Sequence, residues 1–480
     1  MARLIALDVG SSALKAALYD RDQGLIATAE AAYRPDLAPH RQDPEQWWHA
    51  AQKAISSLDT SDVTALVLTG TMENLILLDD KGQSLFPALL YSDPSGAPFL
   101  DQMQPELANA SAILGNTPEP LMTAFKWCWF KSTEPALAAR VATILPGAKD
   151  ALAFRLTGQR VTDPITATTT GLMDIAKRDW SAEMLSLFGV SPAQLPTILD
   201  ASAIIGPLTA SASAFLGLPT SIAVINGCGD AGATTIGSFC EQAGDVSLYL
   251  GTSGWVARVT PLSTLQHDRP VYRLAHPTPE LLIEVTPILS AGAAAAWSRK
   301  ALGLTLEDSE EILRLADAHP PDLLFLPYLS GERSPFIDTD VRGAFIGLDA
   351  SHGASEMAYS VLEGVSLATR ANLLSLDPSG QGAITMVGGG AKSSLWPQLL
   401  ADILERPIGL TADPSAATAL GACRIAAQAL NWPEPKALTK RIISPRPDRQ
   451  KRARRLNAAF TEATRFARQI APMMRSGDVT

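Results

Sequence analysis

The chain has 480 residues, 46% of them hydrophobic and 18% charged, and a net charge of −10. The length predicts two or three domains, and the apolar content excludes a disordered chain, which could not bury enough surface to fold. The chain has no run of about 20 apolar residues, which excludes a membrane span, and Asp8 comes too early for a secretory signal. The net charge argues against nucleic acid as the main partner. We therefore expect a cytoplasmic protein that binds neither membranes nor nucleic acid.

Two similar hairpins are predicted, one at the start of the chain and one near its midpoint. RLIALDV and ALKAALYD flank the turn GSS, and DVSLYL and GWVARVT flank the turn GTS. Strand patterns joined by a short turn of small residues are typical of β-hairpins. A chain that repeats its opening motif halfway along is predicted to have two similar halves. We expect the boundary in the stretch FCEQAGD, which gives domains at 1–242 and 243–480.

Each hairpin tip has small residues, which let backbone N–H groups and hydroxyls approach a phosphate closely. The candidate phosphate-binding residues are Gly10, Ser11, Ser12 and Lys15 at the first tip and Gly251, Thr252 and Ser253 at the second. Asp8 ends the first strand, where its carboxylate can hold a hydrated Mg²⁺. An ordinary hairpin with a capping aspartate is the alternative for one tip alone. Two such tips in equivalent positions favour a nucleotide held between two domains.

Strand and helix patterns alternate between and after the hairpins. VTALVLTGT and SIAVINGCGD have the pattern of buried strands, and DPEQWWHAAQKAISSL and KDALAFRLTG have the pattern of helices. In the second half, the strand pattern AITMVGGGA leads through a glycine turn into the helix pattern SSLWPQLLADIL. This alternation predicts α/β domains with mixed sheets.

Two glycine-rich turns are further candidate ligand sites. VGGGAKSSLW places bare backbone before a helix start, where a flat or anionic ligand can lie. A tight strand-to-helix turn is the alternative. GCGDAGATTIG places Asp230 before a helix of small residues. Composition favours Asp230 as an N-cap, and the alternative is a general base.

The cysteines and a basic segment near the end of the chain have simpler interpretations. Cys128, Cys228, Cys240 and Cys423 match no metal or redox spacing and are predicted to be buried free thiols. Residues 436–455 contain nine Lys or Arg. We predict a linker and a basic-faced helix there, with a nucleic-acid patch as the alternative. The residues expected to dock this helix, because of their helical spacing, are Leu456, Phe460, Ala463, Ala467 and Ile470.

Taken in order, these motifs resemble the FGGY family of carbohydrate kinases and, within it, the xylulokinases. IALDVGSSALKAALYD resembles the first phosphate motif of the family, and FLPYLSGERSP and VGGGAKSSLWPQLLADI resemble xylulokinase segments. Residues 343–363 fit the second family signature at every defined position. The first signature is matched only in part: Thr123, Lys126 and Trp129 agree, whereas Leu121 and Ser132 do not.

The resemblance implies an α/β fold of two actin-like (ribonuclease H-like) ATPase domains flanking a cleft. It also implies transfer of the γ-phosphoryl group of ATP to a sugar or polyol hydroxyl. In such an enzyme both hairpin tips bind the ATP phosphates and Asp8 helps to hold Mg²⁺ through water. Asp230 is then the catalytic base, in place of the N-cap that composition favours. The adenosine lies against Gly389, Gly390 and Ala391. Many members of the family are homodimers, so a homodimer is one expectation.

The sugar side departs from the xylulokinases at three positions. Those enzymes have Met-His where this chain has Met72 and Glu73, Asn where it has Ala231, and Arg where it has Ser95. Glycerol kinases have Glu at the position of Glu73. The expected acceptor is therefore D-xylulose or a related ketose, with glycerol, a tetritol or another polyol as the alternative. A nucleotide-switched binding protein is a more remote alternative. The expected substrate-binding residues are Met72, Glu73, Asp93 and Asp230.

Overall fold

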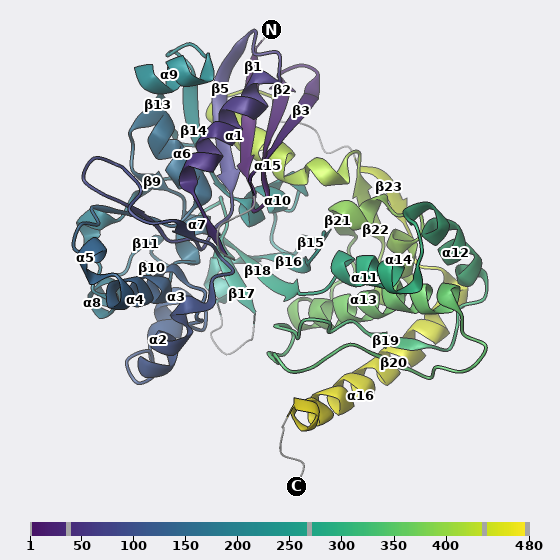
Figure 1. Cartoon of the computed structure of the whole chain (residues 1–480). Coiled ribbons are helices and arrows are strands. Elements are labelled where there is room, and N and C mark those ends of the chain that lie inside the picture. Colours follow the sequence, from purple (N-terminus) through teal and green to yellow (C-terminus); the bar gives the residue numbers. More distant parts are fainter. Residues whose placement is uncertain (1, 35–39, 266–270, 434–438, 476–480) are drawn as a thin grey trace.

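The computed structural model describes residues 2–34, 40–265, 271–433 and 439–475, and its strands form two large sheets, one from each half of the chain (Figure 1). The first sheet has six strands in the order β13-β14-β5-β1-β2-β3. Its strands are β1 (Arg3–Val9), β2 (Ala13–Asp20), β3 (Gly24–Ala32), β5 (Val63–Gly70), β13 (Ile204–Pro207) and β14 (Ala223–Gly229). The first predicted hairpin is confirmed, because β1 and β2 pair antiparallel with Asp8 opposite Lys15.

The apolar run in β1 is explained by burial of both faces of the sheet. Ile5, Leu7 and Val9 pack toward α1 (Pro44–Ser56) and α6 (Ala148–Thr157). Leu4 and Ala6 point the other way, toward α15 (Ala417–Ala429). Both α1 and α6 occupy segments predicted to be helical.

The second sheet has seven strands in the order β17-β18-β16-β15-β21-β22-β23. Its strands are β15 (Val246–Leu250), β16 (Gly254–Pro261), β17 (Tyr272–Ala275), β18 (Leu281–Ile288), β21 (Ile384–Val387), β22 (Ile408–Thr411) and β23 (Thr439–Ile443). Leu250 pairs with Gly254, which confirms the second hairpin. The helices α11 (Gly292–Leu302), α13 (Ala354–Leu376) and α14 (Trp396–Leu404) contribute to the core beside this sheet. In both sheets the first strand of the hairpin also has a parallel neighbour, β5 for β1 and β21 for β15.

One helix of the second half packs against the first half. In the upper part of Figure 1, α15 lies beside both the first sheet and α10 (Asp230–Gly237). Residues of α15 share a core cluster with residues of β1 and β5. The two helices approach closely, since a Cβ atom on Gly237 would lie 1.8 Å from the carbonyl oxygen of Ala417. The division at 242/243 separates the two sheets along the chain and remains our proposed boundary, but α15 packs across it.

A smaller layer is inserted between β5 and β14, and it supplies residues on the sugar side. Its core cluster includes residues of α3 (Ala110–Leu114), α4 (Thr123–Thr133) and α8 (Ala182–Phe188). α7 (Pro164–Thr168) lies between α4 and α8 in the chain, and its Ile165 shares an apolar cluster with Cys228 of β14. The four cysteines of the chain are buried and free, as predicted.

The basic segment near the C-terminus is used for internal ion pairs, although its residues 436–438 lie outside the described part of the chain. Leu456, Phe460 and Ala467 of α16 (Gln450–Arg475) are buried as predicted. The arginine–carboxylate pairs are Arg446 with Asp317 and Asp402, Arg452 with Glu363, Arg454 with Glu405, and Arg455 with Asp322. These pairs support the basic-faced helix and not the nucleic-acid alternative. Among the described residues, no helix combines the length and apolar character that a membrane crossing needs.

Candidate active site

The parallel strands β1, β5 and β14 end side by side, and the segments after them carry most of the predicted site residues. Val9 pairs with Gly70, and Gly70 pairs with Gly229. The next residues along the chain are the tip beginning at Gly10, the loop containing Glu73, and Asp230. In open α/β sheets, ligands bind at the carboxyl ends of the parallel strands. The fold thus brings the phosphate-side and sugar-side candidates of the first half to one edge of the sheet.

The first tip is anchored through its carbonyl groups. The Nε2 of Gln42 donates to the carbonyl of Ser11 at 2.5 Å, and the backbone N–H of Tyr33 donates to the carbonyl of Ser12 at 3.0 Å. The side chains of Ser11, Ser12 and Lys15 are exposed. Their donors therefore remain available to a phosphate. Gln42 was missed by sequence reasoning, because no local pattern shows that it reaches the tip.

Asp8 has a carboxyl group that suits a cation site. Burial raises its pKa to about 6, against the opposing effect of Lys15. Asp230 adds a second negative charge nearby, since Asp8 contributes to raising the pKa of Asp230. Two partly desolvated carboxylates that repel one another fit Mg²⁺, which is usually bound by one or two carboxylates together with substrate phosphates.

Asp230 is the first residue of α10, and Gly229 occupies the N-cap position. The N-cap interpretation that composition favours is therefore wrong, because the chain already turns into the helix at the preceding glycine. A Cβ on Gly229 would lie 2.1 Å from the sulfur of Met72, so the turn packs against that side chain. The pKa of Asp230 is raised to about 7, mainly by burial and then by the charge of Asp8. A carboxylate with this pKa is suited to accept a proton near neutral pH.

A buried charge network behind Asp230 was not predicted. Lys149, Asp150 and Asp163 are fully buried, and the Lys149 Nζ lies 2.8 Å from Asp150 and 3.0 Å from Asp163. The Lys149 ammonium also donates to the Oδ1 of Asn226 on β14 at 3.1 Å. The backbone N–H of Gly229 donates to Asp163 at 3.4 Å, which ties the network to the turn before Asp230. The sequence feature that could have indicated this network is the Lys-Asp pair inside the otherwise apolar helix KDALAFRLTG.

The strand that delivers Asp230 is bent by a bulge. Gly227 has a φ of +65°, and a Cβ there would lie 1.6 Å from the carbonyl oxygen of Leu68. The register between β14 and β5 shifts between Ile225 and Cys228. Glycine is required here because both the conformation and the close approach exclude a side chain. The bulge sets the direction in which the strand reaches Asp230.

The second tip is fixed to the start of α11. The backbone N–H groups of Gly292 and Ala293 donate to the carbonyls of Gly251 and Thr252 at 2.9 and 2.8 Å. Thr252 and Ser253 are exposed, so their donors face outward. Tyr249 stacks on Trp255 below the tip, with ring centroids 4.0 Å apart.

The two hairpins lie close enough to influence one another electrostatically. Burial raises the pKa of the Tyr249 phenol, and the charges of Asp230 and Asp8 raise it further. The end of the second hairpin is therefore near both carboxylates of the first half.

The predicted adenosine turn lies beside the second tip. Gly388 has a φ of +90°, and a Cβ there would lie 2.6 Å from the carbonyl oxygen of Leu250, the last residue of β15. Gly389 is exposed and Gly390 is half-buried, whereas Ala391 is packed in the core of the second half. The two glycines therefore offer the accessible surface of this turn.

Two of the residues expected to bind the sugar differ in their surroundings. Glu73 has a strained backbone, whereas the side chain of Asp93 is held by other groups of the protein. Glu73 has a φ of +60°, uncommon for a residue with a side chain, and its carbonyl accepts from the Lys126 Nζ at 2.6 Å. Asp93 is buried, accepts from the N–H of Ser95 at 2.9 Å and lies 3.7 Å from the guanidinium of Arg41. Asp93 thus organises the loop that contains it. Sequence reasoning missed Glu119, whose charge adds to the effect of burial in raising the pKa of Glu73.

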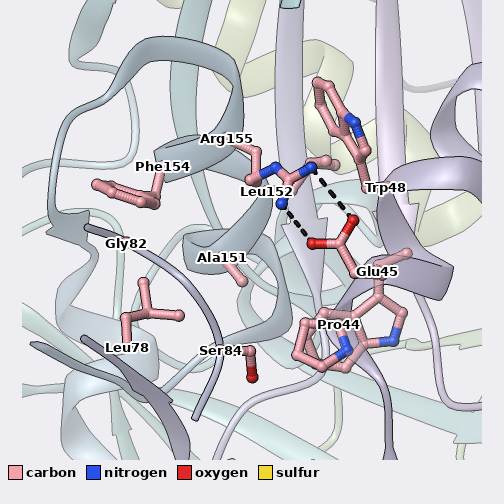
Figure 2. A pocket seen from close by; sticks show the side chains of 11 residues that line it. Pro44, Glu45, Trp48, Leu78, Gly82, Ser84, Ala151, Leu152, Phe154 and Arg155 are labelled. Carbon is pink, nitrogen blue, oxygen red and sulfur yellow. Dashed lines mark hydrogen bonds and ion pairs between the residues drawn. The ribbon is translucent and has the colours of Figure 1, made fainter. Parts of the chain in front are cut away.

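A small cavity outside this site is drawn in Figure 2. It has a volume of about 30 Å³ and lies among Leu78, Leu152, Phe154 and the ion pair of Glu45 with Arg155. This is about the volume of one water molecule. None of the predicted site residues lines it, so it is not the substrate pocket.

The role of Asp8 leads to a prediction about Mg²⁺. Replacing Asp8 by Asn removes the negative charge but keeps the size, and we expect the Mg²⁺ concentration for half-maximal ATP use to rise roughly 10–100-fold, as for other outer-shell ligands. Activity titrated with MgCl₂ at fixed ATP measures this. Asp80→Asn, at an exposed aspartate, is the matched control. An unchanged Mg²⁺ requirement in Asp8→Asn would remove Asp8 from the cation site.

Comparison with known proteins agrees with this geometry. Residues 3–237 match the N-terminal domain of the FGGY family of carbohydrate kinases, and residues 246–430 match its C-terminal domain. The xylulose kinase of Escherichia coli (strain K12) is 33% identical over 438 residues, which are 89% of this chain and 90% of that protein.

Solved structures agree as well. A structure described as a xyloylose kinase from Brucella ovis is 31% identical, with a TM-score of 0.86 over 99% of this chain and 100% of its own. The gluconate kinase of Lactobacillus acidophilus is 25% identical, with a TM-score of 0.89 over 98% of this chain and 99% of its own. These matches confirm the predicted two-domain α/β fold of actin-like type. Because both family models match in sequence order and together span most of its length, the chain belongs to the FGGY family of carbohydrate kinases.

Proposed function

We propose that this carbohydrate kinase transfers the γ-phosphoryl group of ATP to a hydroxyl of D-xylulose or a related ketose, with Asp230 as the base. The single observation that carries the proposal is the position of Asp8, the first hairpin tip and Asp230 at the adjoining ends of β1, β5 and β14. The xylulose kinase of Escherichia coli, similar over nearly the whole chain, supports the ketose.

The site residues would divide the work of phosphoryl transfer. The serines of the first tip and Thr252 and Ser253 of the second would donate hydrogen bonds to the phosphate oxygens. Such donors stabilise charge as it develops in the transition state. Asp8 would help to hold Mg²⁺ through water, and the ion neutralises phosphate charge when it is bound.

Asp230 would also accept the proton of the attacking hydroxyl. The sugar oxygen forms a bond to the γ-phosphorus as the bond between that phosphorus and the β,γ-bridging oxygen breaks. The hydroxyl proton moves to the Asp230 carboxylate, and ADP leaves with the electron pair of the broken bond. A hydroxyl is a weak acid, so we expect this proton transfer late, when the bond to phosphorus is well advanced.

A coupled ADP-release screen over ketoses, alditols and aldonates tests the proposal. The expected result is ADP release that depends on a ketose, with D-xylulose or a close relative giving the highest kcat/KM. Mass spectrometry of the product should show one added phosphate. If no sugar or polyol in the screen yields a phosphorylated product, the proposed function is wrong.

Glu73 favours a second candidate acceptor, a polyol such as glycerol or a tetritol. It is the residue type of the glycerol kinases at this position, and it lies on the loop beside the catalytic turn. The same screen separates the two candidates, because a polyol kinase would prefer an alditol to every ketose.

Truncation of Glu73 tests whether this loop contacts the acceptor. We expect Glu73→Ala to raise the sugar KM by roughly 10-fold or more, because one buried hydrogen-bond partner of a substrate contributes about 1–3 kcal/mol. The ATP KM should change little. Initial rates with each substrate varied in turn measure this, and equal small effects on both KM values would argue against contact.

We also propose that the protein is cytoplasmic and forms a homodimer. Its four buried free thiols suit a reducing compartment. Light scattering coupled to size-exclusion chromatography tests the dimer, and a mass equal to that of one chain would contradict it.

A further inference from the structure

Two residues of α4 hold the loop that carries Glu73. The Oγ1 of Thr123 donates to the carbonyl of Asn74 at 3.0 Å, and the Nζ of Lys126 donates to the carbonyl of Glu73 at 2.6 Å. Thr123 is 1% exposed and Lys126 is 0% exposed. Residues three positions apart are neighbours on the surface of a helix. The helix α4 therefore presents two buried donors, side by side, to two consecutive carbonyls of the loop.

The residues on either side of this loop are also fixed. The carbonyl of Thr71 accepts from the backbone N–H of Ala148 at 3.0 Å. The fully buried side chain of Asn74 reaches back across the loop, and its Nδ2 donates to the same carbonyl of Thr71 at 3.0 Å. The contact between Lys126 and the carbonyl of Glu73 thus acts on a short segment between two fixed points.

Glu73 is held in a conformation that costs free energy. Its φ of +60° lies in the left-handed region, which is unfavourable for a residue with a Cβ atom. Such strain persists only where the surrounding contacts enforce it. A hydrogen bond from a charged donor is stronger than one between neutral groups, and losing it would leave the buried ammonium of Lys126 with one partner fewer. This contact can therefore balance the strain at Glu73.

The strained loop lies beside the turn that leads into Asp230. A Cβ on Gly229 would lie 2.1 Å from the sulfur of Met72, so the residue before Glu73 packs on the residue before Asp230. The Oε1 of Glu73 is buried, and no hydrogen bond reaches it from the described part of the chain. A buried acceptor of this kind is suited to a hydroxyl group of a ligand.

We propose that Thr123 and Lys126 are positioning residues for the acceptor, because they hold the loop in the strained conformation that turns the Glu73 carboxylate toward a sugar hydroxyl. This inference rests on the proposed function for its substrate. The donor atoms of both residues contact backbone carbonyls of the loop. Their effect on the sugar must therefore pass through Glu73.

A double-mutant cycle in steady-state kinetics tests this dependence. Lys126→Met keeps the length of the side chain and removes the ammonium, and it should raise the sugar KM roughly 10-fold, as expected for Glu73→Ala. The ATP KM should change little. In Lys126→Met/Glu73→Ala, the sugar KM should equal that of Glu73→Ala alone, because a displaced carboxylate has no contact left to lose. Effects that multiply to about 100-fold would show that Lys126 acts independently of Glu73 and would overturn the proposal.

Thr123→Val tests the second contact with less risk to folding, because valine has the shape of threonine and lacks the hydroxyl donor. We expect the sugar KM to rise roughly 2- to 10-fold, the effect of one hydrogen bond, and not to rise further when Thr123→Val is added to Glu73→Ala. Lys131→Met is the matched control. The Lys131 Nζ donates to the carbonyl of Phe188 at 2.8 Å, so this variant removes the same kind of hydrogen bond elsewhere on α4. An equal rise of the sugar KM in the control would contradict the proposal.

A stability measurement needs no acceptor and separates this inference from the proposed function. In otherwise wild-type protein, Glu73→Gly should have a higher urea midpoint than Glu73→Ala, because glycine adopts a positive φ without strain. In the Lys126→Met or Thr123→Val background the two midpoints should converge, because the loop can then relax. The greater freedom of glycine in the unfolded chain is the same in every background and cancels.

The two kinds of failure are then distinct. If the midpoints converge while no sugar is phosphorylated, the role of Thr123 and Lys126 in holding the loop stands and the proposed function fails. If glycine keeps its full advantage in both backgrounds while ketoses are phosphorylated, only this inference fails.

Discussion

Replacing Asp230 by Ala is expected to lower kcat for sugar phosphorylation by roughly 10²–10⁴-fold, the usual contribution of a general base. The ATP KM should change little, because the residues proposed to bind ATP are those of the hairpin tips and of the glycine turn after β21, not Asp230. Steady-state kinetics with a coupled ADP assay, together with calorimetric titration of ATP, measure both quantities. Asp101→Ala, at an exposed aspartate on another helix, is the control. Full turnover in Asp230→Ala would exclude this residue from the chemistry.

The wild-type pH profile adds an independent check on Asp230. Its pKa is raised to about 7, so the carboxyl is increasingly protonated below that pH and cannot accept the hydroxyl proton. The kcat/KM is therefore expected to fall as the pH drops through about 7. The acid limb of kcat should lie at lower pH, because bound Mg·ATP favours the ionised carboxylate. An acid limb that is unchanged in Asp230→Asn would have to come from another group.

Replacing Lys149 by Met is expected to cause the largest loss of stability, about 3–5 kcal/mol, which is typical when one partner of a buried ion pair is removed. Lys149 is fully buried between Asp150 and Asp163, and the substitution would leave both carboxyl groups without their cation. Urea unfolding followed by circular dichroism measures the change. Lys53→Met, at an exposed lysine on α1, is the matched control.

The same substitution should also affect catalysis in the folded fraction. Asp163 accepts the backbone N–H of Gly229, so displacement of Asp163 moves the turn that carries Asp230. A lower kcat with an unchanged ATP KM is the expected pattern. An unfolding midpoint equal to that of the wild type would show that the network does not stabilise this half.

The sequence alone predicted the local elements of both halves. The hairpins β1–β2 and β15–β16 follow from short strand patterns around small turns, because side-chain alternation and turn chemistry depend on near neighbours. The helices α1 and α14 follow from apolar periodicity for the same reason. Family resemblance added the role of Asp230, which composition assigned to an N-cap.

Contacts between distant segments were decided only by the tertiary structure. Gln42 reaches the first tip, the Lys126 ammonium reaches the carbonyl of Glu73, and Arg333 pairs with Glu119 across 214 residues of chain. No periodicity predicts such contacts, since each depends on where a loop lies after the sheets have formed. The packing of α15 on the first sheet could not be predicted from the sequence either, because an apolar helix has the same sequence pattern whichever half it covers. The sequence by itself therefore determined the elements, the family and the two hairpins whose tips we propose to bind phosphate. The tertiary structure decided which charged residues lie near one another around Glu119, because Arg333 reaches it only where the two halves are in contact.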